Sequence, residues 1–109
     1  MTVNIQQVQV GFSNYMDAEI IVKAASWDKL KFGFVKAIIL KQIPNMFNEY
    51  RNNPLFKDFV DSNGFINIDE FYSIAKSTIA TTGQFVASGL IFNESDVDKL
   101  YNYIIKAQA

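Results

Sequence analysis

The chain has 109 residues, a net charge of −1 at pH 7, no cysteine and no histidine. The absence of cysteine excludes disulfides and thiolate metal sites, and the absence of histidine removes the commonest general base. A small chain that lacks both has few ways to do acid–base chemistry near neutral pH, so we expect a protein that is not an enzyme and uses no cofactor.

The composition favours a protein that contacts other proteins. Half of the residues are hydrophobic and 15% are aromatic, while 19% are charged; a charged share of about 25% is usual. A single domain spanning residues 1–109 is expected at this length, and its core is too small to hold every aromatic side chain. We therefore expect a homo-oligomer or a permanent protein partner.

Nucleic acid and membrane are not expected partners. Nine of the ten basic residues are lysine, Arg51 is the only arginine, and no basic stripe runs along the chain. Phosphate and base recognition favours clustered basic side chains and bidentate arginine. No apolar run reaches the ~18 residues of a membrane helix, and the N-terminus does not have the pattern of a signal peptide. These observations predict a cytoplasmic protein.

The N-terminal quarter has the pattern of two strands. Residues 3–12 contain an alternation of Val8, Val10 and Phe12 with more polar positions, and residues 18–25 alternate in the same way. This period of two is typical of a half-buried strand. The simplest connection between two such neighbours is an antiparallel β-hairpin.

Residues 32–40, interrupted only by Lys36, are apolar on almost every side of a helix that would begin at Trp27. Periodicity alone does not separate a buried helix from a buried strand here. The length of the segment and the potential N-cap at Ser26 favour a helix, which Pro44 should end or kink before a shorter helix restarts at Asn45. A helix that is apolar all round should be covered on more than one side, so residues 32–40 are a candidate contact region, with Phe32 and Phe34 as candidate contact residues.

The loop after Asn53-Pro54 resembles a calcium-binding EF-hand. A short helix over about 54–62, a turn at Asn63-Gly64 and a helix capped by Asn67 are predicted. Glu70, three residues after the cap, should reach back to the Asn67 amide.

Asp61, Asn63 and Glu70 match the third, fifth and twelfth positions of the EF-hand loop. Phe59 occupies the first position, where an aspartate is normal, and Asp58 lies one residue too early. Losing that ligand weakens a site that depends on its number of oxygens. A capped helix after a tight turn explains the same residues, so calcium is not an expected partner, and a calcium-responsive binding module centred on residues 58–70 is the alternative hypothesis.

The C-terminal third carries the clearest helices. A helix is predicted from Asn67 to about Ala80. Residues 77–93, which begin in its last turn, contain no charged side chain. Within that segment, residues 85–92 are predicted to form one strand or a short hairpin, with Phe85, Leu90 and Phe92 as candidate contact residues. The last helix is amphipathic and is capped by Asn93 or Ser95.

Residues 64–75 and 92–104 resemble segments of small phage and prophage structural or assembly proteins. The matching patterns are Gly-Phe-Ile-Asn-Ile-Asp-Glu-Phe-Tyr and Phe-Asn-Glu-Ser-Asp-Val-Asp-Lys-Leu-Tyr-Asn-Tyr-Ile. The resemblance implies a non-enzymatic assembly protein in the host cytoplasm or in a virion, and it implies no site residues.

The sequence as a whole predicts an α+β fold. Its expected parts are an N-terminal β-hairpin, central helices, a short strand or hairpin near 85–92 and a C-terminal amphipathic helix. The expected function is that of a small structural or protein-interaction module that is oligomeric.

Overall fold

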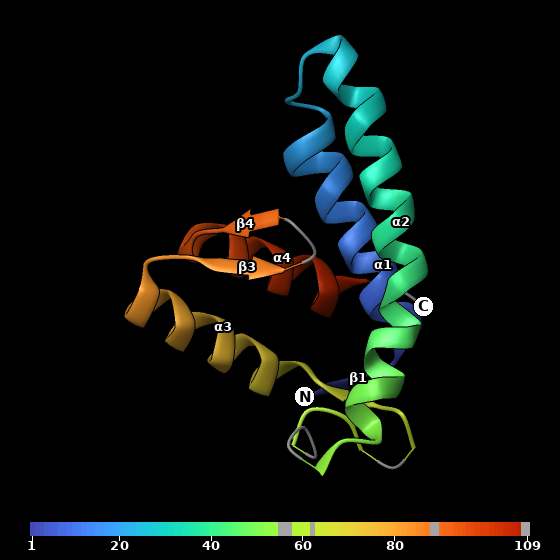
Figure 1. Ribbon diagram of the computed structural model, residues 1–109, viewed down its shortest axis with the longest axis vertical. Helices are drawn as coiled ribbons and strands as arrows, with labels where there is room; N and C mark the ends of the chain where they lie inside the picture. Colours follow the sequence, from blue (N-terminus) through green and yellow to red (C-terminus); the bar gives the residue numbers. More distant parts are fainter. Residues whose placement is uncertain (55–57, 62, 88–89, 108–109) are drawn as a thin grey trace.

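The fold of the computed structural model is built from helices around one apolar core (Figure 1). The structure describes residues 1–54, 58–61, 63–87 and 90–107. In chain order the elements are β1 (Thr2–Val3), α1 (Ile5–Tyr15), the π-helical segment η1 (Met16–Ile21), α2 (Ser26–Arg51), β2 (Ile66–Asn67), α3 (Ile68–Thr82), β3 (Phe85–Ala87), β4 (Leu90–Phe92) and α4 (Glu94–Lys106).

The predicted α+β class is confirmed. Strands β1 and β2 are far apart in the sequence and pair antiparallel, with Thr2 opposite Asn67 and Val3 opposite Ile66. Strands β3 and β4 form an antiparallel hairpin in which Phe85 lies opposite Phe92. The short hairpin near 85–92 and the C-terminal amphipathic helix are therefore also as the sequence predicts. Asn93 caps α4, and its side chain and that of Asp96 each accept a hydrogen bond from the other's backbone N–H.

The N-terminal segment differs from the prediction, because residues 5–21 are helical and the expected pairing of residues 3–12 with 18–25 is wrong. Only Thr2–Val3 is a strand there. The Asn4 side chain starts the helix by accepting a hydrogen bond from the Gln7 N–H at 2.7 Å. Burial then follows Val8, Phe12 and Tyr15, which are spaced by four and three residues. The alternation of Val8 and Phe12 with polar residues fits that helical face as well as it fits a strand.

Helices α1 and α4 cross very closely at Gly11. A Cβ atom added at Gly11 would lie 2.5 Å from Ile104 Cα and 2.9 Å from Ile104 N. Both of these are backbone atoms, so the contact could be relieved only by moving one helix away from the other. Near the same crossing, Gln7 Nε2 donates a hydrogen bond to the Ile104 carbonyl at 3.1 Å. Glycine at position 11 is therefore a condition of this packing.

Helix α2 runs without interruption through Pro44, so the predicted restart at Asn45 is wrong. Proline has no N–H and leaves the carbonyl four residues earlier, that of Leu40, without its helical donor. The side chain of Gln9 in α1 supplies that donor, with Nε2 2.9 Å from the Leu40 carbonyl oxygen. A neighbouring helix thus satisfies the carbonyl that the proline leaves free.

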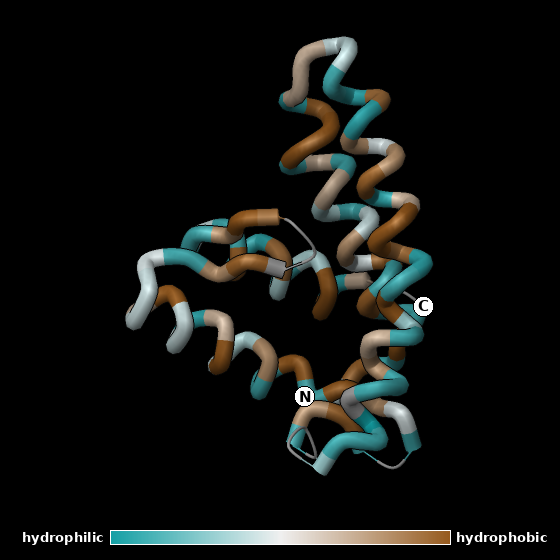
Figure 2. Tube along the Cα trace, viewed as in Figure 1, coloured by the Kyte–Doolittle hydropathy of each residue, from teal (hydrophilic) through white to brown (hydrophobic). Residues whose placement is uncertain are grey.

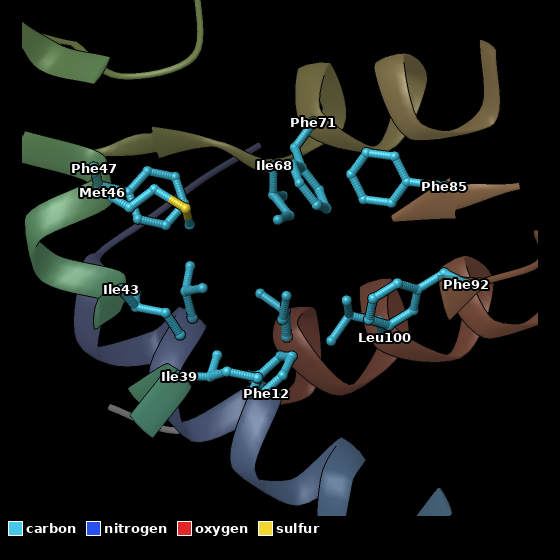
Figure 3. A pocket seen from close by; sticks show the side chains of 12 residues that line it. Phe12, Ile39, Ile43, Met46, Phe47, Ile68, Phe71, Phe85, Phe92 and Leu100 are labelled. Carbon is cyan, nitrogen blue, oxygen red and sulfur yellow. The ribbon is translucent and has the colours of Figure 1, made fainter. Parts of the chain in front are cut away.

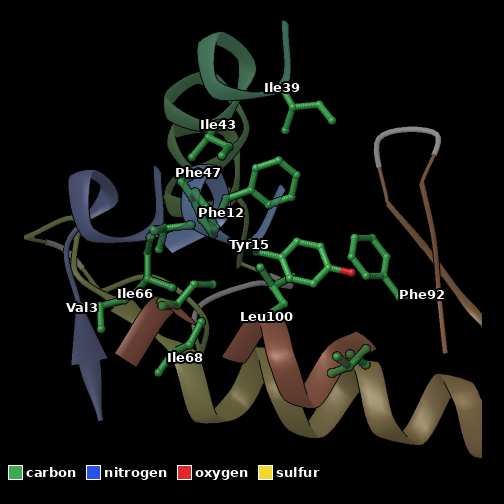
Figure 4. Close-up of a cluster of buried hydrophobic side chains, with 14 of the residues drawn as sticks. Val3, Phe12, Tyr15, Ile39, Ile43, Phe47, Ile66, Ile68, Phe92 and Leu100 are labelled. Atoms are coloured by element: carbon green, nitrogen blue, oxygen red, sulfur yellow. The ribbon is translucent and has the colours of Figure 1, made fainter. Parts of the chain in front are cut away.

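The core lies where α1, α2, α3, α4 and both small sheets meet (Figure 4). The Tyr15 ring lies among three other aromatic rings there, with centroid distances of 5.9 Å to Phe92, 6.2 Å to Tyr103 and 6.4 Å to Phe12. Helix α2 contributes Ile39, Ile43 and Phe47, which are spaced by four residues along its inner side. The upper half of α2 in Figure 2 is also rich in hydrophobic residues, although it rises beyond α3 and the β3–β4 hairpin.

Replacing Gly11 by alanine should destabilise the fold. The added methyl group gains up to ~1 kcal/mol of helix propensity but forces α1 and α4 apart, and overpacking of this kind costs about 1–3 kcal/mol. We expect a net loss of about 2 kcal/mol, seen in chemical denaturation as a lower midpoint with little change in slope. Gly33→Ala in α2 is the matched control: nothing lies within 4 Å of its added Cβ, so that variant should be slightly more stable. Equal stability of the two variants would contradict the close crossing.

Candidate functional site

The loop that resembles an EF-hand is a hairpin turn held by Asp61. Its Oδ1 accepts hydrogen bonds from the N–H groups of Asn63 and Phe65, both at 2.9 Å. The Asp61 carbonyl also accepts from the Gly64 N–H at 3.0 Å, and Gly64 has a φ of +84°. The positive φ predicted for this turn is therefore found at Gly64.

The segment before the turn differs from an EF-hand. Residues 58 and 59 form a turn, and Val60 pairs antiparallel with Ile66, so the predicted helix does not extend through these residues. Residues 55–57 and 62, which that helix would include, lie outside the described residues.

Asn67 caps α3 as predicted, with Oδ1 accepting from the Glu70 N–H at 3.2 Å. Its own N–H donates to the Phe59 carbonyl at 2.7 Å, which is why the Glu70 side chain does not fill that role. Over residues 1–54, 58–61, 63–87 and 90–107, no group of three or more acidic side chains gathers where it could hold a metal ion. In this geometry Asp61 holds the turn, Asp58 and Asn63 lie in turns, and Glu70 lies in the first turn of α3.

A polar cluster joins α3 to α4 at the surface. Lys76 Nζ lies 2.8 Å from Glu94 Oε1 and 3.0 Å from Asp98 Oδ1, and the Tyr72 hydroxyl donates to the same Asp98 oxygen at 2.7 Å. The Glu94 and Asp98 carboxylates hold the pKa of Lys76 well above its ordinary value. The Tyr72 hydroxyl and the Lys76 ammonium lower the pKa of Asp98. These hydrogen bonds join α3 to α4, because Tyr72 and Lys76 of α3 bind Glu94 and Asp98 of α4.

An apolar cavity of about 80 Å³ lies between α2, α3 and the hairpin (Figure 3). Its wall is formed by hydrophobic side chains from six elements, namely Val8, Phe12, Ile39, Ile43, Met46, Phe47, Ile68, Phe71, Phe85, Phe92, Leu100 and Ile104. A catalytic pocket needs polar groups that orient a substrate, and these lining residues offer none from their side chains. The cavity is a packing space in the core.

The candidate contact residues of the hairpin point inward or lie at its edge. Phe92 is 2% exposed, Phe85 and Leu90 are half-buried, and the Phe85 and Phe92 rings lie 6.2 Å apart. Successive side chains of a strand alternate between its faces, so the cross-strand pair Val86 and Ile91 is on the exposed side instead. The prediction of Phe92 as a surface contact is wrong for this reason.

Four of the exposed large hydrophobic side chains lie on α2. Trp27, Leu30, Phe34 and Ile38 are 81%, 69%, 63% and 56% exposed. At 100° per residue these four positions fall within about 80° of one another, opposite Ile39 and the other core-facing residues. We call these four residues the outer face of α2. In Figure 1, α2 runs along one edge of the molecule with no other element beyond it.

Sequence reasoning recovered this face only in part. Phe34 was a predicted contact residue and is exposed; Phe32 was another and is half-buried. Trp27 and Leu30 were missed, and Ile38 was included only as part of the 32–40 segment, because a segment that is apolar on every side does not reveal which side meets the core. The signal that was available is the spacing of these residues from Phe34 by seven, four and four positions.

Comparison with known proteins found no similar family, curated protein or solved structure. Among the helices of the described residues, none is both long enough and apolar enough to cross a membrane.

Substitutions of Asp61 test whether its carboxylate stabilises the turn or binds calcium. We expect that it stabilises the turn. Asp61→Ala removes two hydrogen bonds to backbone N–H groups, which corresponds to a loss of about 1–3 kcal/mol. Asp61→Asn keeps the accepting oxygen and should retain most of the stability. Thermal unfolding of the wild type in millimolar calcium and in a chelator should coincide. A higher melting temperature in calcium that Asp61→Asn abolishes would instead identify a cation site.

The polar cluster predicts a loss of stability in acid. The folded-state pKa of Asp98 is below its ordinary value, so the folded chain binds fewer protons than the unfolded chain near pH 4. The stability that Asp98 contributes is present above that pH and is lost as the pH falls through the lowered pKa. Urea denaturation from neutral pH down to about pH 3 should show a smaller acid loss in Asp98→Asn than in Asp58→Asn. Identical pH profiles would contradict the role of this cluster.

Proposed function

We propose that this chain is a non-enzymatic structural module that binds another protein chain through the outer face of α2. The observation that supports this most directly is the row of Trp27, Leu30, Phe34 and Ile38, each more than half exposed. Exposed apolar surface that forms one continuous patch is typical of an interaction site, whereas scattered apolar residues are ordinary. Tryptophan and phenylalanine are also among the residues enriched in protein interfaces.

The form of the face favours a protein partner over a lipid or nucleic-acid surface. Its residues follow a narrow row with separations of three, four and four, which is the pattern of side chains that pack against another helix. The chain has a net charge of −1, so neither an anionic bilayer nor a phosphate backbone would attract the whole molecule. An apolar row with few charges is suited to a dry protein–protein contact.

The proposal includes an assembly role. It agrees with the resemblance of residues 64–75 and 92–104 to small phage and prophage structural proteins, and with the low share of charged residues in the chain. An assembly protein needs a permanent contact surface and no chemistry of its own. The apolar lining of the core cavity supports the non-enzymatic part of the proposal.

Photo-crosslinking tests the proposed function without assuming who the partner is. A benzophenone amino acid in place of Phe34 should form a covalent adduct with a protein when the producing cells are irradiated. The same group in place of Ser73, which is exposed on α3, serves as the matched control and should give little adduct. Replacing Trp27 and Leu30 by glutamine should remove the Phe34 adduct, because those changes take away neighbouring contact surface. Equal adducts from positions 34 and 73, or none from either, would overturn the proposal.

A further inference from the structure

We infer that the outer face of α2 binds a second copy of this chain, with the two α2 helices antiparallel and a two-fold axis passing beside Phe34. This inference rests on the proposed function and names its partner. The spacing of the face, its area and the charges at its edges support a second copy of the chain as the partner.

The spacing of the outer face of α2 becomes symmetric about Phe34 when Lys41, the next residue on the same side of the helix, is included. Trp27, Leu30, Phe34, Ile38 and Lys41 are separated by three, four, four and three residues, with Phe34 at the centre. An antiparallel two-fold pair brings each position level with its mirror position across the centre, because such a symmetric contact uses the same patch on both copies. Phe34 then meets Phe34 of the second copy, and Leu30 meets Ile38. A helix face built for an unrelated partner has no need of this symmetry.

The area of the face is sufficient for a dimer. From their exposed fractions, the four apolar side chains present about 540 Å² together, taking ~200 Å² for each fully exposed large side chain. Complete burial of a pair of such faces would cover about 1,100 Å², which reaches the ~1,000 Å² expected of a specific interface. The contact would be at the lower end of stable interfaces, so we expect an affinity near the micromolar range.

The charges at the edges favour the antiparallel direction. In a parallel pair Lys41 would lie beside Lys41 of the second copy, and like charges that meet directly are unfavourable. In the antiparallel pair Lys41 lies level with Trp27 of the second copy, where an ammonium group can rest on an indole ring. Lys31, at the other edge, is then separated along the axis from its equivalent by about 9 Å at 1.5 Å per residue, so the repulsion between them is largely screened at physiological salt.

The ends and the flank of the face also fit a helix partner. Beyond Lys41 the same side of α2 carries the exposed polar residues Asn45 and Asn48, which limits the apolar row to the N-terminal half. Gly33 and Ala37 lie one turn apart along one flank, and a Cβ added at Gly33 meets nothing within 4 Å. Among the residues that the structure describes, no contact requires a glycine at this position of a helix. The small side chains would let a second helix approach closely.

Sedimentation velocity over about 1–500 µM tests the partner, since this range brackets a micromolar dissociation constant. The wild type should pass from monomer to dimer as its concentration rises. Phe34→Asp should weaken the dimer at least tenfold, and Gly33→Leu should weaken it while adding apolar surface, because the larger side chain holds the helices apart. Ser73→Asp is the control and should behave as the wild type. Circular dichroism should show that all four proteins are equally folded.

Cysteine cross-linking tests the direction of the pair in a chain that has no cysteine of its own. An equimolar mixture of Leu30→Cys and Ile38→Cys should form a mixed disulfide dimer on mild oxidation, at higher yield than either variant alone. In the antiparallel pair the two Leu30 positions are about 12 Å apart along the axis, too far for a disulfide. A parallel pair would cross-link Leu30→Cys with itself and would overturn the inference.

The two proposals fail in different ways. A wild type that remains monomeric at every concentration overturns the second copy as the occupant. If position 34 still photo-crosslinks to another protein, the interaction function stands and only this inference falls. If position 34 gives no adduct and the wild type is monomeric, both proposals fall.

Discussion

The packing of α1 against α4 at Gly11 is the constraint on which the rest of the fold depends. The approach of Gly11 to the Ile104 backbone is so close that no side chain fits between the helices. It joins the first helix of the chain to the last, and the core gathers around that joint from α2, α3 and the two small sheets. Because α1 is fixed in this way, it covers one side of α2 and leaves the opposite side of its N-terminal half without cover.

Helix α2 therefore has two apolar sides, of which one is buried and the other is exposed to solvent. Its inner side, which includes Ile39 and Ile43, is buried, while its outer face remains exposed. The polar contacts of the chain serve the fold: Gln9 satisfies the carbonyl freed by Pro44, Asp61 holds a turn, and Lys76 joins α3 to α4. The outer face of α2 is left without such a structural explanation. This exposed apolar surface is the basis of the proposed protein contact.

Sequence patterns predicted the parts of the fold that depend on local signals. The caps at Asn67 and Asn93, the turn at Gly64 and the hairpin near 85–92 were all recovered, because each depends on residues within a few positions of one another. The N-terminal helix was missed because Val8 and Phe12 fit both periods, and the deciding contact of Gly11 with Ile104 joins residues far apart in the sequence. Of the four residues on the outer face of α2, the sequence named Phe34 as a candidate contact, and that side chain is exposed. Which side of an apolar helix faces solvent is decided by tertiary packing and not by the helix itself.

The fluorescence of Trp27 tests the central claim most directly, since it is the only tryptophan of the chain and lies on the outer face of α2. At high dilution the account predicts an emission maximum typical of an indole in water. As the concentration of the protein rises, the maximum should move to shorter wavelength in the wild type but not in Phe34→Asp. An emission that is already that of a buried indole at the lowest concentration, or one that stays unchanged up to the highest, would contradict the account.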